Sequence, residues 1–330
     1  MATAEPGKPG PQAGRAEEYL APETLAQLIP FELRARAIAE GAMHGMHRSP
    51  RQGSAVEFSA HRLYASGDSV RHLDWKVFGR TDRLYVKQYR QETNLEIGVL
   101  VDSSASMRFG TLAVKSGWGG TDASRRMARW TKWDHATACA AAIAYLCLSQ
   151  RDRVGASVFA KGIRANTRRS ASQSQWRSIV QLLSLEPVDG TADLVRSINQ
   201  LLAKGGERLL LCILSDFLMP EGEVREALGR IKHAGHDAIL LAIPDHSELH
   251  MDLEDPRPFL GLEGEGVLEA DPLEIRAAYL EEMRLHLETL ERTCVQLGFD
   301  LQVLDSQDSV GTALAALLAR REHFNRRRSA

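Results

Sequence analysis

The stretch LEIGVLVDSSASM, residues 95–107, joins an unbroken apolar run to a polar turn. Residues 95–101 have the length and the continuous apolar character of a strand that is buried on both faces. Asp102, Ser104 and Ser106 follow directly, at alternate positions. A carboxylate and two hydroxyls at this spacing can converge on one hard cation, and such oxygen ligands favour Mg²⁺ over zinc or copper. The stretch therefore predicts a sheet strand that ends in a candidate metal site.

Strand-like and helix-like segments alternate after this stretch. Helical spacing of apolar residues occurs at 134–148, 176–183, 191–202, 224–231 and in the segment after Pro272, and strand-like runs occur at 154–159, 209–214, 237–243 and 299–304. The pattern predicts an α/β fold with a doubly wound, mostly parallel sheet that helices cover on both faces. Ligands of such sheets bind beyond the carboxyl ends of the strands. The residues that directly follow strands are therefore the informative ones.

Two further polar positions follow this rule. Thr191 opens a predicted helix, and Asp216 ends the strand at 209–214. A polar turn after one strand is explained as well by simple capping of the chain. Three such positions in this order, each at a predicted sheet edge, favour a metal site.

These five residues resemble the metal-ion-dependent adhesion site (MIDAS) of the von Willebrand factor A (VWA) fold, whose Asp-x-Ser-x-Ser, Thr and Asp come from three loops. The matching positions are Asp102, Ser104, Ser106, Thr191 and Asp216. The resemblance implies a bound divalent cation, Mg²⁺ or else Mn²⁺ or Ca²⁺. It also implies that an acidic residue of a protein partner completes the coordination.

The upstream residues sharpen the resemblance. The residues concerned are Glu57-Phe58, Arg62-Leu63-Tyr64, Gly67-Asp68, Arg71, Asp74-Trp75, Arg80 and Val86-Lys87. They are similar to the signature of the family called domain of unknown function 58, which carries a VWA-like domain and is typically encoded beside MoxR-type AAA+ ATPases. The similarity extends from about 51 to about 320. We expect a non-catalytic, metal-dependent adaptor, and the family analogy suggests that it works with a MoxR-type ATPase in the assembly or maturation of other proteins.

The chain is expected to have four parts. A disordered tail spans 1–19, a helical and hairpin accessory region spans 20–93, the VWA-like domain spans 94–320, and a basic tail spans 321–330. A length of 330 residues with 44% apolar residues suits one large domain and an accessory piece.

Composition also bears on partners and location. A net charge of −2 argues against a dedicated nucleic-acid binder. No run approaches the roughly 20 apolar residues of a membrane helix. The four cysteines form no Cys-x-x-Cys pair, which excludes a thiolate zinc site and fits a reducing compartment. The expected location is therefore the cytoplasm, with no integral membrane segment.

Two segments could form a partner surface. Arg71 and Asp74 belong to the charge-dense stretch 57–80, which is explained equally by a structural network of ion pairs. A long insertion at 111–131 carries further residues of the types enriched in interfaces, and the alternative is an insertion whose tryptophans pack against the domain. The candidates in the insertion are Trp118, Arg125, Arg126 and Trp130.

Catalysis has weak support in the sequence, and we expect no catalytic and no cofactor-binding residue. Ser104, His135 and Asp216 could form a hydrolase triad, but no Gly-x-Ser-x-Gly motif accompanies them. Two other readings stay open, a Mg²⁺-dependent hydrolase at the same ion and an interaction module whose metal site is structural or vestigial. His246, His250 and Glu248 could also bind a metal, although histidines in an acidic loop are more often solvated.

Overall fold

The computed structural model describes residues 56–64, 74–81, 83–91, 96–113, 129–149, 151–172, 174–203, 208–264, 266–308 and 310. The expected tails and the part of the accessory region before residue 56 lie outside the described residues. The described chain divides into two units, one that ends at Gln91 and one that begins at Glu96.

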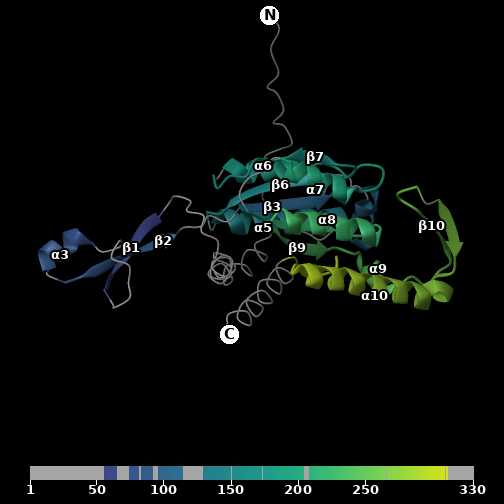
Figure 1. The fold of residues 1–330 in the computed structure, drawn as a ribbon. Coiled ribbons are helices and arrows are strands. Elements are labelled where there is room, and N and C mark those ends of the chain that lie inside the picture. The colour runs from purple at the N-terminus through teal and green to yellow at the C-terminus, as the bar shows by residue number, and fades with distance from the viewer. Residues whose placement is uncertain are drawn as a thin grey trace, which may run out of the picture. The chain divides into compact units, whose positions relative to one another are not determined.

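The first unit is a hairpin with a short helix. Strands β1 (Val56–Leu63) and β2 (Tyr85–Gln91) pair in antiparallel fashion, and α3 (Trp75–Thr81) lies between them in the sequence (Figure 1). Asp74 precedes this helix, and its carboxylate accepts a hydrogen bond from the Val77 N–H at 3.3 Å. This contact satisfies a backbone donor of the first turn. The predicted accessory hairpin is confirmed.

The second unit contains a six-stranded sheet in the order β12-β9-β8-β3-β6-β7 (Figure 1). Five strands are parallel, and β7 runs antiparallel to β6 at one edge. In chain order the strands are β3 (Glu96–Asp102), β6 (Arg153–Phe159), β7 (Ile163–Asn166), β8 (Leu209–Ser215), β9 (Asp237–Ala242) and β12 (Asp300–Val303).

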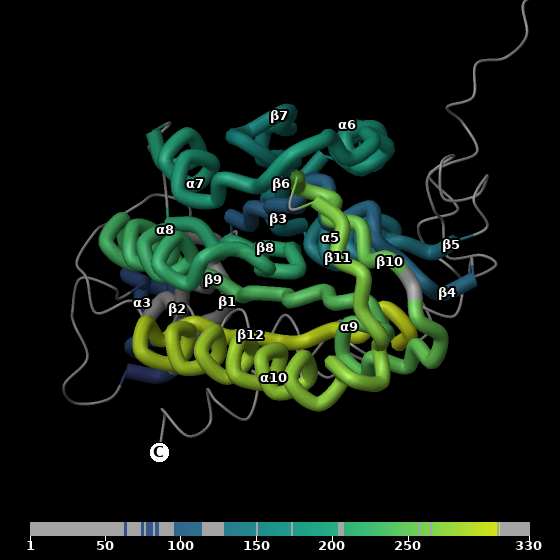
Figure 2. Tube along the Cα trace, turned by 90° about the vertical axis from the view of Figure 1, so that its right-hand side faces the viewer, coloured from purple at the N-terminus to yellow at the C-terminus, as the bar shows by residue number. Residues whose placement is uncertain are grey.

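Helices cover both faces of this sheet (Figure 2). Helices α5 (Lys132–Ser149) and α6 (Ser174–Leu183) pack on one face, and α7 (Leu194–Leu202), α8 (Glu221–His233) and α10 (Pro272–Leu297) pack on the other. Strand β3 shows why its sequence is continuously apolar. Val99 and Val101 enter the core below α5 and α6, whereas Leu100 enters the opposite core. The predicted doubly wound VWA-like α/β class is confirmed.

Helix α10 begins and ends where its sequence predicts. The Asp271 carboxylate accepts from the Leu273 N–H at 2.9 Å, and Pro272 occupies the first turn. Gly298 ends the helix in the left-handed region with φ +73°, a conformation that glycine adopts without the steric cost other residues bear.

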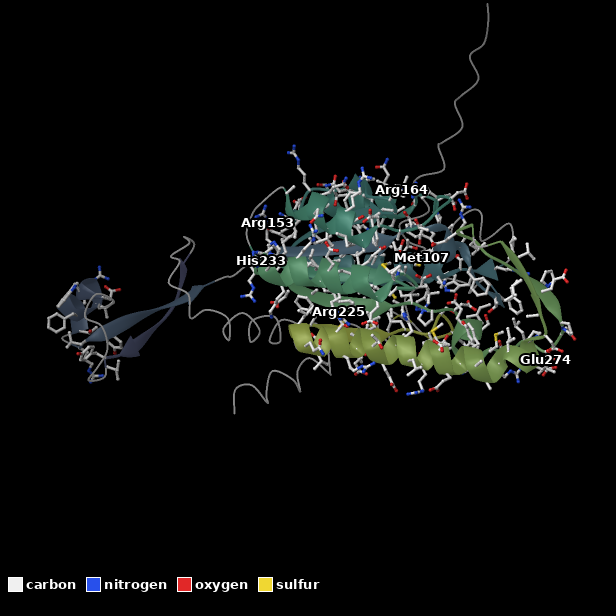
Figure 3. All side chains as sticks on the ribbon, turned by 45° about the vertical axis from the view of Figure 1, so that its right-hand side comes forward. Met107, Arg153, Arg164, Arg225, His233 and Glu274 are labelled. Atoms are coloured by element: carbon white, nitrogen blue, oxygen red, sulfur yellow. The ribbon has the colours of Figure 1, made fainter. Side chains whose placement is uncertain are left out.

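Several small elements gather at the carboxyl edge of the sheet (Figure 2). They are the 3₁₀ turn η2 (Ala105–Arg108), the short ladder of β4 (Leu112–Ala113) with β5 (Arg129–Trp130), α9 (His246–His250), and the hairpin of β10 (Arg257–Leu260) with β11 (Val267–Ala270). The sequence analysis predicted none of the last three features. Met107 of η2 is fully buried and lies inside the domain in Figure 3, so it anchors the turn that carries the predicted serines.

Candidate functional site

The site begins with Asp102, the last residue of β3. Its side chain is fully buried, and both carboxylate oxygens are held. The Ser104 N–H donates to Oδ1 at 2.9 Å, and the Ser215 hydroxyl donates to Oδ2 at 2.6 Å. Ser215 ends β8, which pairs with β3 in parallel register. The two strand ends therefore meet as the predicted topology requires.

The two serines converge beside Asp102. The η2 turn brings the Ser104 and Ser106 hydroxyl oxygens to 3.1 Å from each other. The Ser106 side chain also hydrogen-bonds the carboxylate of Asp216. Four of the five predicted ligands are thus brought together at the ends of β3 and β8.

A lysine that the sequence analysis did not select stands beside them. Lys132 is the first residue of α5, and its side chain is only 1% exposed. Its Nζ lies 2.7 Å from Asp216 Oδ2 and 2.7 Å from Glu248 Oε1. Glu248 comes from α9 and also accepts the Asp245 N–H at 2.8 Å. A buried ammonium is therefore shared by two carboxylates from separate elements.

Local structure fixes the start of α5 and with it this lysine. Thr131 and Asp134 exchange hydrogen bonds across the first turn, with the Thr131 N–H donating to the Asp134 carboxylate at 2.9 Å. The Lys132 N–H donates to the Phe109 carbonyl at 2.8 Å. A Cβ on Gly110 would come within 2.1 Å of the Trp130 carbonyl, so this close approach of two backbones requires glycine.

The ionisation of the two aspartates differs. Burial, together with the charge of Asp216, raises the pKa of Asp102 to about 7. Burial would also raise the pKa of Asp216, but the Lys132 ammonium outweighs it and lowers that pKa. Lys132 itself keeps its charge, because the carboxylates of Asp216 and Glu248 overcome burial and raise its pKa.

This cluster fits a divalent cation on two counts. Three carboxyl groups face one ammonium, so the buried site holds two surplus negative charges once Asp102 ionises, above a pH of about 7, and a divalent ion would balance them. Adjacent ligands of an octahedral Mg²⁺ at 2.0–2.1 Å lie about 2.9 Å apart, close to the 3.1 Å between the Ser104 and Ser106 oxygens. The donors are all oxygen, as Mg²⁺ prefers.

Comparison with known proteins identifies the family of this chain. The model of the family described as "Protein of unknown function DUF58" matches residues 60–289. The chain belongs to the DUF58 family. Uncharacterized proteins of Mycobacterium tuberculosis and Mycobacterium bovis are 30% identical to it over 235 residues, which is 70% of this chain and 68% of each relative.

Solved structures with a similar fold are more distant from this DUF58 chain in sequence. A conserved hypothetical protein, BatB from Bacteroides thetaiotaomicron, is 14% identical with a TM-score of 0.40, and the match covers 69% of this chain and 99% of that one. The SpRpn10 VWA domain is 10% identical with a TM-score of 0.35, and the match covers 67% and 94%.

The predicted cytoplasmic location is corrected by this comparison. Another similar structure is described as an aerotolerance-related membrane protein from Bacteroides fragilis, at 15% identity and a TM-score of 0.39 over 69% of this chain and 98% of that one. Within the described part of the DUF58 chain, no helix is long and apolar enough to span a membrane.

The fifth predicted ligand lies on the loop before α7. Thr191 is exposed and precedes the cap residue of α7, Asp193, whose carboxylate accepts the Arg196 N–H at 2.7 Å. Its neighbour Gly190 does reach the site, because the Gly190 carbonyl accepts the Ala105 N–H at 3.0 Å. The loop of Thr191 therefore borders the η2 turn.

Of the partner-surface candidates in this DUF58 chain, the structure places two. Trp130 was a candidate for an exposed partner surface, and this is wrong: it is fully buried, and its Nε1 donates to His135 Nδ1 at 3.3 Å, which favours the alternative that it packs against the domain. Asp74 is also buried and faces the first turn of α3, which favours the structural interpretation of that segment. The remaining candidates lie outside the described residues, namely Arg71, Trp118, Arg125 and Arg126.

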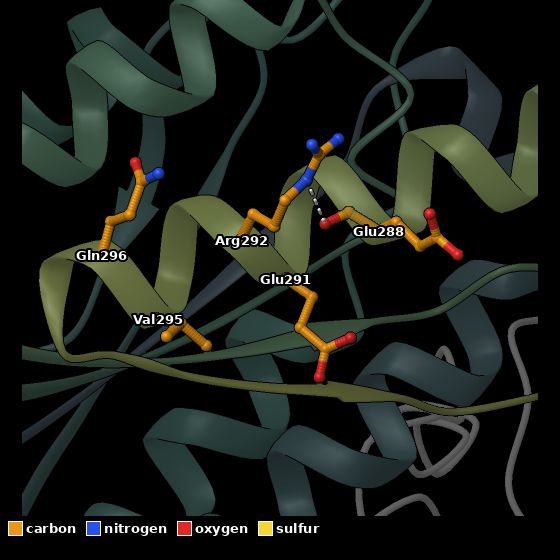
Figure 4. A pocket seen from close by; sticks show the side chains of 5 residues that line it. All are labelled: Glu288, Glu291, Arg292, Val295 and Gln296. Atoms are coloured by element: carbon orange, nitrogen blue, oxygen red, sulfur yellow. Dashed lines mark hydrogen bonds between the residues drawn. The ribbon is translucent and has the colours of Figure 1, made fainter.

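A cleft opens next to the site, between the strand ends and the β10–β11 hairpin. Its walls include Ser106, Lys132 and Leu218 on one side and hairpin residues such as Phe259 and Glu263 on the other. The Glu263 carboxylate reaches the Ser106 N–H at 3.4 Å. An acidic side chain of the DUF58 chain itself thus approaches the predicted metal ligands. Another hollow, along α10, is lined by one helix (Glu288, Glu291, Arg292, Val295 and Gln296; Figure 4) and brings no such groups together.

Sequence reasoning missed Lys132, and Glu248 and Glu263 have roles it did not foresee. Lys132 shares the first turn of its alanine-rich helix with Asp134, and nothing in that pattern singles it out. Glu263 sits between Gly261 and Gly264 at a hairpin tip, and nothing in the sequence points from there to β3.

Proposed function

We propose that this DUF58 protein is a non-catalytic interaction module that binds a divalent cation, Mg²⁺ or else Mn²⁺ or Ca²⁺, through Asp102, Ser104, Ser106 and Asp216. The single observation that carries the proposal is the convergence of these oxygen donors in a buried cluster, where three carboxyl groups face one ammonium. Thr191 is the expected fifth ligand, on the adjoining loop. The bound ion supplies a Lewis-acidic anchor for a carboxylate of a protein partner.

Neighbouring residues orient the two aspartates of the site. Ser215 and the Ser104 N–H hold the Asp102 carboxylate in one orientation. Lys132 holds the Asp216 carboxylate and keeps it ionised. This leaves the serine hydroxyls and the free lone pairs of the carboxylates to face the ion, with little rearrangement on binding.

The surroundings of the site suit a protein ligand. On the hairpin, Leu260, Val267 and Leu268 are 61–69% exposed, and all three line the cleft that contains Ser106. An acidic residue flanked by apolar side chains matches that combination. By family resemblance the partner is a MoxR-type AAA+ ATPase, and the protein takes part in the assembly or maturation of other proteins.

Non-catalytic behaviour is supported by the placement of the histidine that could act as a base. His135 lies inside α5, fully buried, and its Nδ1 accepts from the buried Trp130. With its Nδ1 occupied by the indole N–H, His135 is not placed to take a proton from the Ser104 hydroxyl.

The test is Mg²⁺-dependent binding of a MoxR-type ATPase from the same organism to the immobilised full chain. We expect binding in Mg²⁺, loss in EDTA, and loss in Asp102→Ala, with the same variant lacking Mg²⁺ binding by calorimetry. Asp252→Ala removes an exposed aspartate and is the matched control.

Each rival interpretation has its own outcome. Partner binding that survives both EDTA and Asp102→Ala would assign the metal site a structural or vestigial role. Phosphoester or peptide hydrolysis that survives repurification and disappears in Asp102→Ala would make the protein a metal-dependent hydrolase.

A further inference from the structure

A second group of potential metal ligands lies on α9 and the loop after β12. His246 Nδ1 is 2.7 Å from Asp305 Oδ2, and His250 Nε2 is 3.7 Å from the same oxygen. The two imidazole rings stand 4.4 Å apart between centroids. One ligand atom from each residue lies within 4.8 Å of the other two. The histidines are four residues apart and so share one face of their helix.

Hydrogen bonds hold this group in place. The Asp245 carboxylate and the Glu248 side chain form a capping box that fixes the start of α9. The Gln307 N–H donates to Asp305 Oδ1 at 2.8 Å, which turns Oδ2 toward the imidazoles. The His246 N–H donates to the Ser306 hydroxyl at 3.1 Å and ties the helix to the loop. The ligand geometry is thus largely formed before any ion binds.

The donor set suits a borderline cation. Two imidazoles and one carboxylate are ligands of Zn²⁺ and related transition ions rather than of Mg²⁺. Ligands of a tetrahedral Zn²⁺ at 2.0–2.1 Å lie about 3.4 Å apart, and the distances of 2.7 and 3.7 Å to Asp305 Oδ2 stand on either side of that value. Changes of about 0.7 and 0.3 Å would bring these two distances to that value, and His250, with 55% of its side chain exposed, leaves a path for the ion.

Helix α9 keeps this group separate from the strand-end site. Glu248 lies two residues from each histidine, and its carboxylate points instead to Lys132. The sequence analysis grouped Glu248 with the histidines. In the structure the third member of the group is instead Asp305, 55 residues further along from His250.

We propose that His246, His250 and Asp305 form a second metal site, which takes Zn²⁺ or a similar transition ion with three protein ligands and one open position. The site joins α9 to the loop after β12. It uses ligands distinct from those of the Mg²⁺ site, and either site can therefore be disabled alone.

The experiment measures Zn²⁺ binding to the full chain by competition with a chromogenic chelator, and Co²⁺ binding by its visible absorption. His250→Ala removes an exposed ligand, and Asp305→Asn replaces the carboxylate with a neutral group of the same shape. His233→Ala, on the surface of α8 (Figure 3), is the matched control. Asp102→Ala disables the other site.

We expect one Zn²⁺ to bind and to raise the melting temperature of the wild-type protein. His250→Ala and Asp305→Asn should each weaken binding roughly tenfold or more and remove the Co²⁺ absorption, whereas His233→Ala and Asp102→Ala should leave both unchanged. The proposal fails if the wild-type protein binds no Zn²⁺, or if binding disappears in Asp102→Ala and persists in His250→Ala.

Discussion

The strand-end cluster and the α9 cluster lie at the same edge of one sheet and differ in nearly every physical respect. Around Asp102 and Asp216 the donors are oxygen atoms, the carboxylates are buried, and a buried lysine balances part of their charge. Around His246 and His250 the donors are mainly nitrogen, the side chains are 24% and 55% exposed, and solvent shares the charge.

The difference shows what burial does to a group of charges. A buried cluster holds its geometry firmly, but every unpaired charge in it is costly. A half-exposed cluster tolerates the loss of a member, because water replaces it. The following predictions test this contrast, from the largest expected effect to the smallest.

Lys132→Met should have the largest effect on stability. The change leaves Asp216 and Glu248 in the interior without their shared cation, and breaking a buried pair in this way costs about 3–5 kcal/mol. Urea denaturation of the metal-free protein should show this loss. His250→Ala at the exposed cluster should cost less than about 1 kcal/mol. Lys161→Met removes an exposed lysine and is the control; a loss equal to that of Lys132→Met would contradict the contrast.

The pH dependence of stability should report the buried Asp102. Its pKa in the folded protein is about 7, above the ordinary value of 3.8, so the folded state binds the proton more tightly than the unfolded state. The contribution of Asp102 to stability is therefore greatest at low pH, decreases as the pH rises from about 4 to about 7, and is constant above that.

Asp102→Asn provides the measurement. In EDTA, the free energy of unfolding of the wild-type protein minus that of the variant should fall across this pH window. Saturating Mg²⁺ should reduce the fall, because a bound cation stabilises the ionised carboxylate. A difference that is flat with pH would show that Asp102 ionises normally.

Glu263→Gln should have the smallest effect. The Glu263 carboxylate approaches Ser106 from the β10–β11 hairpin, so its removal takes one negative charge from the edge of the site. At partial exposure this corresponds to a two- to fivefold weaker Mg²⁺ affinity, or about 0.5–1 kcal/mol. Calorimetry would measure it, with the exposed Glu269→Gln on the same hairpin as control. Equal affinities in the two variants would mean that the hairpin acid does not act on the ion.

The sequence predicts the sheet well because its strands are buried on both faces. Runs such as 97–101 and 209–214 are apolar without interruption and too short for a buried helix, which indicates strands between two layers of helices. The short elements at the carboxyl edge were missed. Strands β10 and β11 carry exposed apolar residues such as Leu260 and Val267, which have no alternating pattern that would distinguish them from a loop.

Some residues of the candidate site could also be predicted from the sequence, and others could not. Asp102 and Asp216 could be found because each directly follows a strand, and parallel strands end at one edge. Lys132 could not, because its two partners lie 84 and 116 residues away along the chain. Trp130 was assigned to the surface from its position in a polar, glycine-rich insertion, but its backbone pairs with Leu112 and its ring fills the core.

The buried ammonium of Lys132 has a consequence for how long an ion stays. An incoming divalent cation would meet a pocket that already contains one positive charge 2.7 Å from Asp216. This ammonium neutralises part of the negative charge of the carboxylates and so weakens their attraction for the ion. Compared with a cage made only of acids, such a pocket releases its ion more readily. For the ion that we propose, Lys132 would therefore shorten the residence time, and with it the lifetime of a complex anchored on that ion.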